Sequence, residues 1–397
     1  MKKQILVIGP GMEIGGVERG LLGLLDAIDY DQFDVDLFLF CHTGEFMPYI
    51  NPKANLLPEY RPIALINDPI ARLFYQGHWY MAFLRLICKL YGDQRAKRCH
   101  TTTISTLLCR KIVSKRIPPF PKEYDYALGF FLPHDLLNNK VCAKVKIGWV
   151  HTDYTNRAEK PDTVFMLSMW AKLDYIACVS EGVRRSFCAV FPAVAAKTVT
   201  VENILSPALI QSQAEEFDAS AEMPGDGRLR ILSVGRFCTA KAFDRVPEVC
   251  RQLLEQGCPV RWYLIGYGPD ETLIRRKIQE FQANDSVVIL GKKKNPYPYM
   301  KRCDLYAQPS RYEGRAVTVT EAQILHKPVL ITRYETSAEQ LREGVDGFIC
   351  EQGVDGIAEG VRYLAEHPEV RKRFMENTGR LCYENTDEIK KIWALRV

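Results

Sequence analysis

The sequence contains no long uninterrupted hydrophobic run. Of its 397 residues 47% are apolar, yet no stretch reaches the about 18 uncharged apolar residues that a membrane-spanning helix requires. The longest candidate, 79–91, is interrupted by Arg85 and Lys89. The apolar run in MKKQILVIGPG ends in a glycine-rich turn and not in a small-residue cleavage site, which favours a buried strand over a secretory signal. We therefore expect a cytoplasmic protein.

Paired cysteines and metal-ligand spacings are also missing. The 13 cysteines are scattered, form no C-x-x-C pair, and include Cys178 and Cys350 inside apolar runs. This pattern is typical of reduced thiols in a protein core. No Cys/His cluster has zinc spacing. Asp34 and Asp36 lead into the apolar run VDLFLF, which favours charges at the start of a strand over a metal-binding D-x-D pair. We expect no catalytic metal and no other cofactor.

The length of the chain and the order of its apolar segments predict two domains of the α/β class. A chain of 397 residues is too long for one hydrophobic core. A strand at 4–8, a glycine-rich turn at 9–16, a helix at 17–28 and a strand at 35–40 alternate as in a parallel sheet covered by helices. The alternation recurs later, with strands at 230–234, 260–265, 286–290, 304–308 and 328–331 and helices at 270–281 and 317–325.

A polar stretch with proline and glycine separates the two halves. Residues 206–229 have no sustained periodicity and are predicted as the linker region. They divide a Rossmann-like domain at 1–205 from a second doubly wound domain at 230–380. Residues 381–397 are expected to form a helix that packs back on the first domain.

The segment from Ser310 to Glu321 has the pattern of an anion site. A strand ends at Pro309, a loop carries Glu313, and a helix is predicted to begin near Val317. The N-terminus of a helix offers free N–H groups and a partial positive charge, which suit a diphosphate. The two glutamates on either side could each accept sugar hydroxyls, although spacing alone leaves open that Glu321 is only a favourable first-turn acid.

This segment resembles family 4 of the retaining glycosyltransferases, which share the GT-B fold of two Rossmann-like domains facing across a cleft. The resemblance runs through the whole chain and includes the type that builds bacterial capsules and surface polysaccharides. Its landmarks occur in order: GGVER at 15–19, WVH at 149–151, VSEGVRRSF at 180–187, VEN at 201–203, VGR at 234–236, IGYGP at 265–269, LG-x3-NPYPYM at 290–300, and SRYEG-x6-EA at 310–322 followed by KPVL. Each motif is weak alone, but their order and spacing together are specific.

The resemblance implies a role for each of these positions. Arg236 and Lys241 would stabilise the negative charge on the leaving diphosphate. Glu313 would face the hydroxyls of the donor sugar. The remaining positions would contact the donor: the ribose at Glu321, phosphate oxygens at Ala316, Val317 and Thr318, the reacting phosphate at Gly15 and Gly16, the C6 hydroxyl of the sugar at His151, and the nucleotide-sugar at Gly266.

The sequence departs from the family pattern at two places. The family often has Lys-Gly where this chain has Lys241-Ala242, and Phe-Gly or Phe-Pro where it has Arg315-Ala316. The second departure leaves the identity of the donor open, because Arg315 could contact a charged donor or acceptor or could point to solvent. UDP-sugars and GDP-mannose both remain open as donors.

Other classes of enzyme fit the sequence less well. A hydrolase would need its two carboxylates to flank a glycosidic bond, whereas Glu313 and Glu321 flank a predicted phosphate site. The run GPGMEIGG nearly matches a dinucleotide fingerprint, but the following strand ends in FCHT at 40–43 without the acid that would hold the ribose. We therefore expect a hexosyltransferase that retains anomeric configuration. The alternative is a non-catalytic partner subunit that binds nucleotide-sugar.

The acceptor is expected to be a glycan or a lipid-linked glycan in surface polysaccharide synthesis, and no nucleic acid is expected as a partner. Residues 85–116 carry nine Lys or Arg residues against the lone Asp93, with apolar residues interleaved from Trp79 onward. This stretch fits either a solvated helical face or a peripheral contact of 79–116 with anionic lipid at the inner membrane face.

Overall fold

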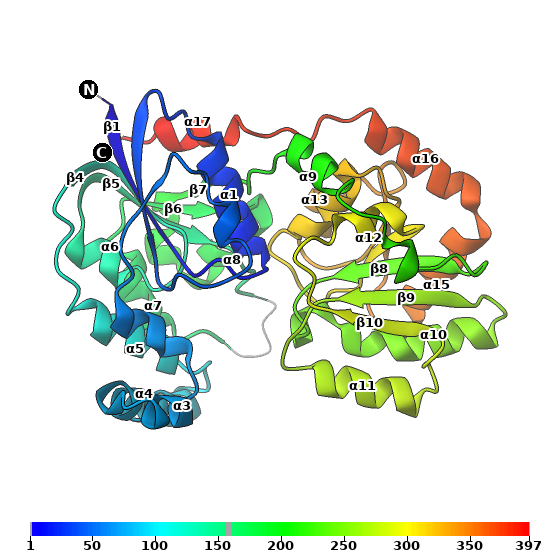
Figure 1. The fold of residues 1–397 in the computed structure, drawn as a ribbon, viewed down its shortest axis with the longest axis horizontal. Helices are drawn as coiled ribbons and strands as arrows, with labels where there is room; N and C mark the ends of the chain where they lie inside the picture. Colours follow the sequence, from blue (N-terminus) through cyan, green and yellow to red (C-terminus); the bar gives the residue numbers. More distant parts are fainter. Residues whose placement is uncertain (1, 156–159, 397) are drawn as a thin grey trace. The chain divides into compact units, whose positions relative to one another are not determined.

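The computed structural model describes residues 2–155 and 160–396, and the chain divides into two compact units. Unit 1 comprises Met1–Ile204 together with Thr386–Val397, and unit 2 comprises Leu205–Asn385. Figure 1 shows that each unit is built around its own sheet with helices packed against it.

Unit 1 contains a seven-stranded parallel sheet in the order β3-β2-β1-β4-β5-β6-β7. Its strands are β1 (Lys3–Gly9), β2 (Phe33–Leu39), β3 (Asn55–Leu56), β4 (Glu123–Gly129), β5 (Cys142–Val150), β6 (Tyr175–Cys178) and β7 (Thr198–Thr200). The order reverses between β1 and β4, which are hydrogen-bonded neighbours although more than a hundred residues separate them. Such a reversal is where ligands bind in doubly wound folds.

The helices of unit 1 connect these strands, and α3 and α4 lie at the periphery, away from the sheet (Figure 1). They are α1 (Gly16–Ala27), α2 (Arg61–Ala64), α3 (Ile70–Tyr75), α4 (Trp79–Cys99), α5 (Ser105–Ser114), α6 (Asp135–Lys140), α7 (Thr163–Trp170), α8 (Glu181–Val190) and α17 (Glu388–Trp393). The last of these packs into the core of unit 1, where Trp393 stacks on Phe33 at 4.6 Å between ring centroids and its carbonyl accepts a hydrogen bond from the Tyr126 hydroxyl at 3.1 Å.

Unit 2 contains a six-stranded parallel sheet in the order β10-β9-β8-β11-β12-β13. Its strands are β8 (Leu229–Val234), β9 (Val260–Ile265), β10 (Val287–Gly291), β11 (Leu305–Gln308), β12 (Val329–Thr332) and β13 (Phe348–Cys350). Its helices are α9 (Pro207–Gln213), α10 (Val246–Glu255), α11 (Glu271–Glu280), α12 (Tyr297–Arg302), α13 (Val317–Ile324), α14 (Ser337–Gln340), α15 (Val354–Glu366) and α16 (Pro368–Gly379). Here the order reverses between β8 and β11.

Alternating side chains of the central strands of unit 2 enter two separate cores. Ile231 and Trp262 pack with residues of α10, α11 and α15. Leu232 and Tyr263 pack on the opposite face with residues of α9, α12 and α13. Figure 1 shows α10 and α11 on one side of β8–β10 and α9, α12 and α13 on the other. The unit is therefore doubly wound, because successive residues of a strand point to opposite faces and both faces are covered.

The predicted α/β class and the two Rossmann-like units are confirmed by these sheets, and the strand predicted at 260–265 matches β9 to the residue. Residues 206–229, suggested by the sequence as a linker, form α9 and a short 3-10 turn at Ala219–Ala221. Their apolar side chains Ile210 and Met223 are buried in the core of unit 2. The short length of these elements explains why no periodicity is visible in the sequence.

All 13 cysteines are free thiols. Seven of them are buried, whereas Cys99, Cys142 and Cys382 are exposed, so the prediction of core thiols holds only for part of the set. Among the described residues, no helix combines the length and the apolar character needed to cross a membrane.

Candidate functional site

The candidate site in unit 2 is built where the strand order reverses. The loop after β8 carries Arg236 and Lys241, and the loop after neighbouring β11 carries Glu313. The carboxyl ends of parallel strands meet at one edge of the sheet, so two loops that are far apart in sequence lie side by side there. This topology brings Lys241 and Glu313 together.

The ammonium group of Lys241 lies 2.5 Å from Oε1 of Glu313. The side chains of this pair are only 18% and 11% exposed. The same oxygen also accepts a hydrogen bond from the Ser310 hydroxyl at 2.6 Å and a longer one from Nε2 of Gln308 at 3.4 Å. Glu313 is therefore held as a carboxylate in a fixed orientation by one charged and two neutral donors.

A buried chain of hydrogen bonds extends behind Glu313. The Tyr306 hydroxyl donates to Oε1 of Gln308 at 2.8 Å, and Nε2 of Gln308 donates to Oγ of Ser310 at 2.9 Å. Tyr306, Gln308 and Ser310 are fully buried, and burial raises the pKa of Tyr306, so its hydroxyl remains protonated as the donor. Because the tyrosine fixes which end of the Gln308 amide is the acceptor, the amide must point its N–H groups toward the site.

Hydrogen bonds of Arg311 connect the loop after β8 with the loop after β11, close in sequence to Lys241 and Glu313. Arg311 forms two hydrogen bonds of 2.8 Å with the carboxylate of Asp244, and its backbone N–H donates to the carbonyl of Ala240 at 2.8 Å. Burial acts to raise the pKa of Asp244, but the hydrogen bonds and positive charge of Arg311 outweigh it, and the pKa is lowered. A bidentate Arg–carboxylate pair fixes both distance and angle, so it sets the separation between Lys241 and Glu313.

The first departure from the family pattern lies at a special backbone position. Ala242 has φ 56° and ψ 27°, in the left-handed region, and its side chain is completely buried. A residue with a Cβ atom is strained in this conformation by about 1–2 kcal/mol, whereas glycine is not. The glycine that often follows the lysine in the family therefore has a backbone cause, and this chain keeps the conformation with alanine.

Arg236 and Gly266 follow β8 and β9. The Arg236 side chain is exposed and forms no hydrogen bond or ion pair with any described residue. Gly266 has φ 150°, and a Cβ atom there would lie 1.9 Å from the carbonyl oxygen of Gly235. Only glycine allows the two loops to approach so closely. This backbone packing accounts for Gly266, and its contact with a donor stays a prediction.

The N-terminus of α13 is partly occupied. The backbone N–H of Ala316, predicted to hold phosphate, donates to Oε1 of Gln340 at 2.9 Å. Val317 and Thr318 are the first two helical residues, whose N–H groups lie before the first intrahelical hydrogen bond. The contact of these two N–H groups with phosphate oxygens stays a prediction. Arg315 is half-buried. Burial raises the pKa of Tyr334, and the positive charge of Arg315 opposes this rise.

Glu321 lies inside unit 2 and not on its surface. It is completely buried, and its Oε1 accepts a hydrogen bond from the Tyr297 hydroxyl at 3.0 Å. Tyr297 is the first residue of α12, within the NPYPYM motif, and is itself buried. The predicted contact of Glu321 with a ribose stays a prediction.

Unit 1 places its predicted residues at its own reversal. Gly15 is the N-cap of α1 and has extended backbone, and a Cβ atom on it would meet the Glu18 carboxylate at 2.3 Å. Gly16 is the first residue of the helix. His151 follows β5, and its Nε2 lies 2.9 Å from the carbonyl oxygen of Phe130, which follows β4.

The protonation of His151 follows from this contact. Burial lowers its pKa to about 4, against the opposing effect of the hydrogen bond to Phe130, so the ring is neutral at pH 7. A carbonyl oxygen can only accept, so the proton is on Nε2 and Nδ1 is left as an acceptor. A neutral acceptor suits a sugar hydroxyl better than a phosphate.

The sequence did not point to several residues that shape these sites. Gln308, Ser310 and Gln340 hold Glu313 or α13 in place, and Tyr297 covers Glu321. Of these residues only Ser310 and Tyr297 belong to motifs identified in the sequence, SRYEG and NPYPYM. Neither motif predicts which side chain the residue contacts. In the part of the chain that the structure describes, no group of three or more His, Cys, Asp or Glu side chains is placed to hold a metal ion.

Comparison with known families gives the class of domain that unit 2 represents. Residues 215–380 match the family described as glycosyl transferases group 1, and they make up most of unit 2. The match includes Arg236, Lys241, Glu313 and Glu321 by position. Unit 2 therefore carries a glycosyl transferase group 1 domain.

Curated relatives include transferases of bacterial polysaccharide synthesis. The chain is 29% identical over 133 residues to the amylovoran biosynthesis glycosyltransferase AmsK of Erwinia amylovora, which is 32% of this chain and 33% of that protein. It is 26% identical over 163 residues to the capsular polysaccharide biosynthesis glycosyltransferase CapM of Staphylococcus aureus, which is 40% of this chain and 43% of that protein. The aligned segments thus span about a third to a half of these relatives.

Solved structures extend the likeness in fold to the whole chain. TarM of S. aureus superposes with a TM-score of 0.69 at 12% identity over 99% of both chains. Anabaena HepE in complex with UDP-glucose superposes with a TM-score of 0.67 at 15% identity over 99% of this chain and 100% of that one. Identities this low show the fold alone, and the fold is that of the GT-B proteins.

Proposed function

We propose that this protein is a retaining glycosyltransferase that moves a hexose from a nucleotide-sugar to a glycan or lipid-linked glycan acceptor in surface polysaccharide synthesis. The observation that carries the proposal is the contact between Lys241 and Glu313 at the strand-order reversal of a glycosyl transferase group 1 domain. AmsK and CapM, named for polysaccharide biosynthesis, and HepE, solved with UDP-glucose, support the class of donor and product.

The chemistry needs a cation at the leaving group and a hydrogen-bond acceptor at the sugar. Lys241 has three N–H donors, and its contact with Glu313 uses one of them, which leaves two for diphosphate oxygens. Arg236, exposed and without a partner among the described residues, supplies the second cation. Charge that develops on the departing diphosphate is stabilised by cations already in place. Glu313, fixed by Ser310, accepts hydroxyls of the transferred sugar.

Retention is proposed from the resemblance together with the side chains present. Oε1 of Glu313 is already engaged by Lys241 and Ser310. A carboxylate engaged in this way is a poor covalent nucleophile. We therefore propose front-face departure of the diphosphate, with a phosphate oxygen taking the proton of the acceptor hydroxyl. In unit 1, the neutral ring of His151 offers Nδ1 as an acceptor for a sugar hydroxyl.

A thermal-shift panel tests donor binding. UDP, GDP and their sugars are added separately to the full chain, because a ligand that binds the folded state raises the melting temperature by mass action. One nucleotide should stabilise the wild type and fail to stabilise Arg236→Ala. Arg373→Ala, an exposed arginine on α16 of the same unit, is the matched control and should respond like the wild type. Equal responses of all three proteins would overturn the proposed role of Arg236.

We also propose that α4 docks unit 1 on anionic lipid at the inner membrane face. The helix exposes an apolar stripe at helical spacing, with Trp79, Phe83, Ile87 and Leu90 each at least 52% exposed, while Met81 and Cys88 face the core. Figure 1 shows α4 and α3 at the periphery of unit 1, away from its sheet. A stripe this apolar on an exposed helix marks a contact with lipid or protein.

Charge favours lipid over an apolar protein partner. Lys89, Lys97 and Arg98 are exposed on the same helix and offer cations to anionic headgroups. Two other basic residues of the stretch are structural. Arg95 pairs with Asp162, and Arg110 is buried between the rings of Phe40 and Phe131, each 5.3 Å from its guanidinium carbon. Burial lowers the pKa of Arg110 to about 10.

Vesicle flotation tests this docking. The wild type should float with vesicles containing phosphatidylglycerol and less with neutral vesicles, and Ile87→Gln combined with Leu90→Gln should abolish flotation. Leu254→Gln, which removes an exposed leucine of unit 2 (45% exposed), is the control and should leave flotation unchanged. Absence of the wild type from both kinds of vesicle would refute the lipid contact, and the proposed transfer reaction would stand independently.

A further inference from the structure

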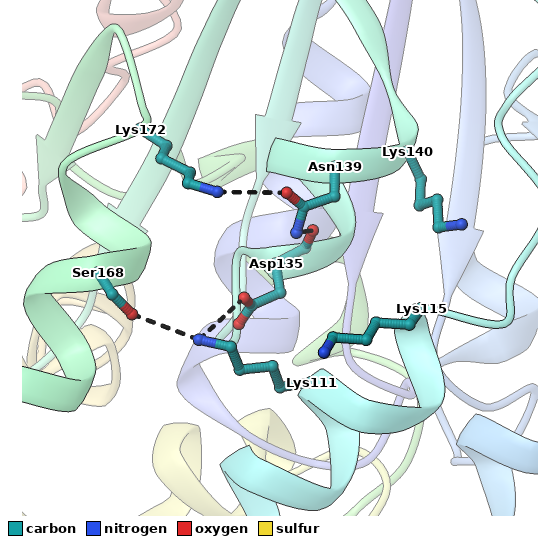
Figure 2. A pocket seen from close by; sticks show the side chains of 7 residues that line it. All are labelled: Lys111, Lys115, Asp135, Asn139, Lys140, Ser168 and Lys172. Carbon is teal, nitrogen blue, oxygen red and sulfur yellow. Dashed lines mark hydrogen bonds and ion pairs between the residues drawn. The ribbon is translucent and has the colours of Figure 1, made fainter.

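Unit 1 contains a pocket of about 410 Å³ that shares no residue with the candidate site. Its walls come from α5, α6 and the end of α7, as Figure 2 shows, and its lining is dominated by lysine. The side chains that matter here are Lys111, Lys115, Lys140 and Lys172 together with Asp135 and Asn139. A volume of this size lies within the range of about 300–1,000 Å³ typical of sites for small molecules.

The positive charge of this pocket is not balanced. Four lysines line the pocket together with a single carboxylate, that of Asp135. Lys111 lies 3.4 Å from Oδ1 of Asp135, and Lys172 donates to Oδ1 of Asn139 at 3.4 Å. Lys115 and Lys140 form no hydrogen bond or ion pair with any described side chain. Figure 2 shows Lys111, Lys115 and Lys172 extending toward Asp135 and Asn139, with Lys140 at one side. Ammonium groups that converge without counterions favour an anionic ligand.

Asp135 adds to this positively charged pocket a hydrogen-bond acceptor that has no donor in the described part of the chain. The residue is only 6% exposed, and its Oδ2 is buried without a hydrogen-bond partner among the described residues. A buried polar atom without a partner is unfavourable and rare in folded proteins. Burial also raises the pKa of Asp135, against the charge of Lys111. A hydroxyl group on a ligand would supply the missing donor.

We propose that this lysine pocket binds a saccharide that carries an oxyanion. Lys111, Lys115 and Lys172 would surround a phosphate or a uronate carboxylate, and a sugar hydroxyl would donate to Oδ2 of Asp135. An inorganic anion without a hydroxyl group, such as sulfate, would satisfy the lysines and leave Asp135 unsatisfied, whereas a neutral sugar would do the reverse. The lysine pocket is separate from the proposed donor site, because the two share no residue. The pocket lies in unit 1, whereas Arg236, Lys241 and Glu313 lie in unit 2.

Isothermal titration calorimetry on the full chain tests the pocket with glucose 1-phosphate, glucuronate, glucose and inorganic sulfate. We expect one of the two charged sugars to bind, and the stronger one identifies the oxyanion. Lys115→Gln combined with Lys172→Gln should weaken it by about tenfold or more, because two charge-assisted contacts are lost. The control, Lys372→Gln with Lys390→Gln, removes the same charge from exposed helices and should bind like the wild type. Arg236→Ala should also retain binding, which separates this pocket from the donor site.

Asp135→Asn tests the hydroxyl contact. The substitution removes negative charge from beside the oxyanion, so inorganic sulfate should bind more tightly while the preference for the charged sugar over sulfate falls. The proposal is overturned if neither charged sugar binds, if the Lys115 and Lys172 variant binds like the wild type, or if inorganic sulfate binds the wild type as tightly as the charged sugars.

Discussion

The pair formed by Lys241 and Glu313 should be measurable as a coupling energy. Both side chains are mostly buried, at 18% and 11% exposed, and lie 2.5 Å apart. An exposed pair contributes about 0–1 kcal/mol, while loss of one partner of a fully buried pair costs about 3–5 kcal/mol. The Lys241–Glu313 pair lies between these limits, and Ser310 still bonds a residue at 313 after substitution. We therefore expect a coupling energy of about 2 kcal/mol.

A double-mutant cycle measures this coupling. Lys241→Met and Glu313→Gln are made singly and together, and their stabilities are compared in urea at pH 7. Hydrogen exchange of peptides from β8 and β11 reports the opening of unit 2 separately from unit 1. Arg251 and Glu255, 2.7 Å apart but 39% and 60% exposed, form the control cycle and should couple by less than about 0.5 kcal/mol. A coupling no larger at Lys241–Glu313 than at this exposed pair would refute the geometry described for the site.

Three further predictions concern the backbone, the histidines and the reaction. Ala242→Gly should change the free energy of unfolding by less than about 1 kcal/mol, because relief of left-handed strain offsets the lost methyl group. The control, Ala358→Gly in buried helix α15, should lower the free energy of unfolding by about 1.5–2 kcal/mol. A similar loss at both positions, measured in urea, would contradict the strain at Ala242. Burial lowers the pKa of His134 to about 3 and that of His151 to about 4, so the unfolded chain takes up protons first and stability should fall as the pH drops below 6.5. In His134→Gln this loss should be smaller by about 2 kcal/mol at pH 5, and an unchanged pH profile would show that His134 is not buried as described. The transferred sugar should keep its anomeric configuration by NMR in the presence of EDTA, and an inverted product or a requirement for manganese would each contradict the proposed mechanism.

The fold was predictable because its signals are local. The strand at 260–265 is a short apolar run bounded by turns, and the start of α13 at Val317 follows a loop with Glu313 and Gly314. Two doubly wound units follow from such segments in alternation. The order of the strands, and hence the contact of Lys241 with Glu313, depends on crossovers that no local pattern encodes. For these two residues only the resemblance to a family indicated that both act on the same donor.

The parts that were not predicted depend on contacts between distant residues. Gln340 reaches Ala316, and Tyr297 reaches Glu321, across 24 residues in each case. Neither tyrosine nor glutamine carries a sequence signal for such a partner. The stretch 206–229 looked like a linker because its apolar residues are few, and their burial becomes visible only when α12 and α13 are in place beside it. The lysine pocket likewise draws on three helices that are separate in sequence.

Transfer of a radiolabelled sugar tests the central claim most directly. The full chain is incubated with the nucleotide-sugar that stabilises it, together with a membrane extract as the source of acceptor, and label in the glycan or lipid fraction is counted. The account predicts turnover by the wild type, near-complete loss in Glu313→Ala, and turnover like that of the wild type in Glu359→Ala, which changes an exposed glutamate on α15 of the same unit. Binding of the donor without any turnover, or turnover that persists in Glu313→Ala, would contradict it.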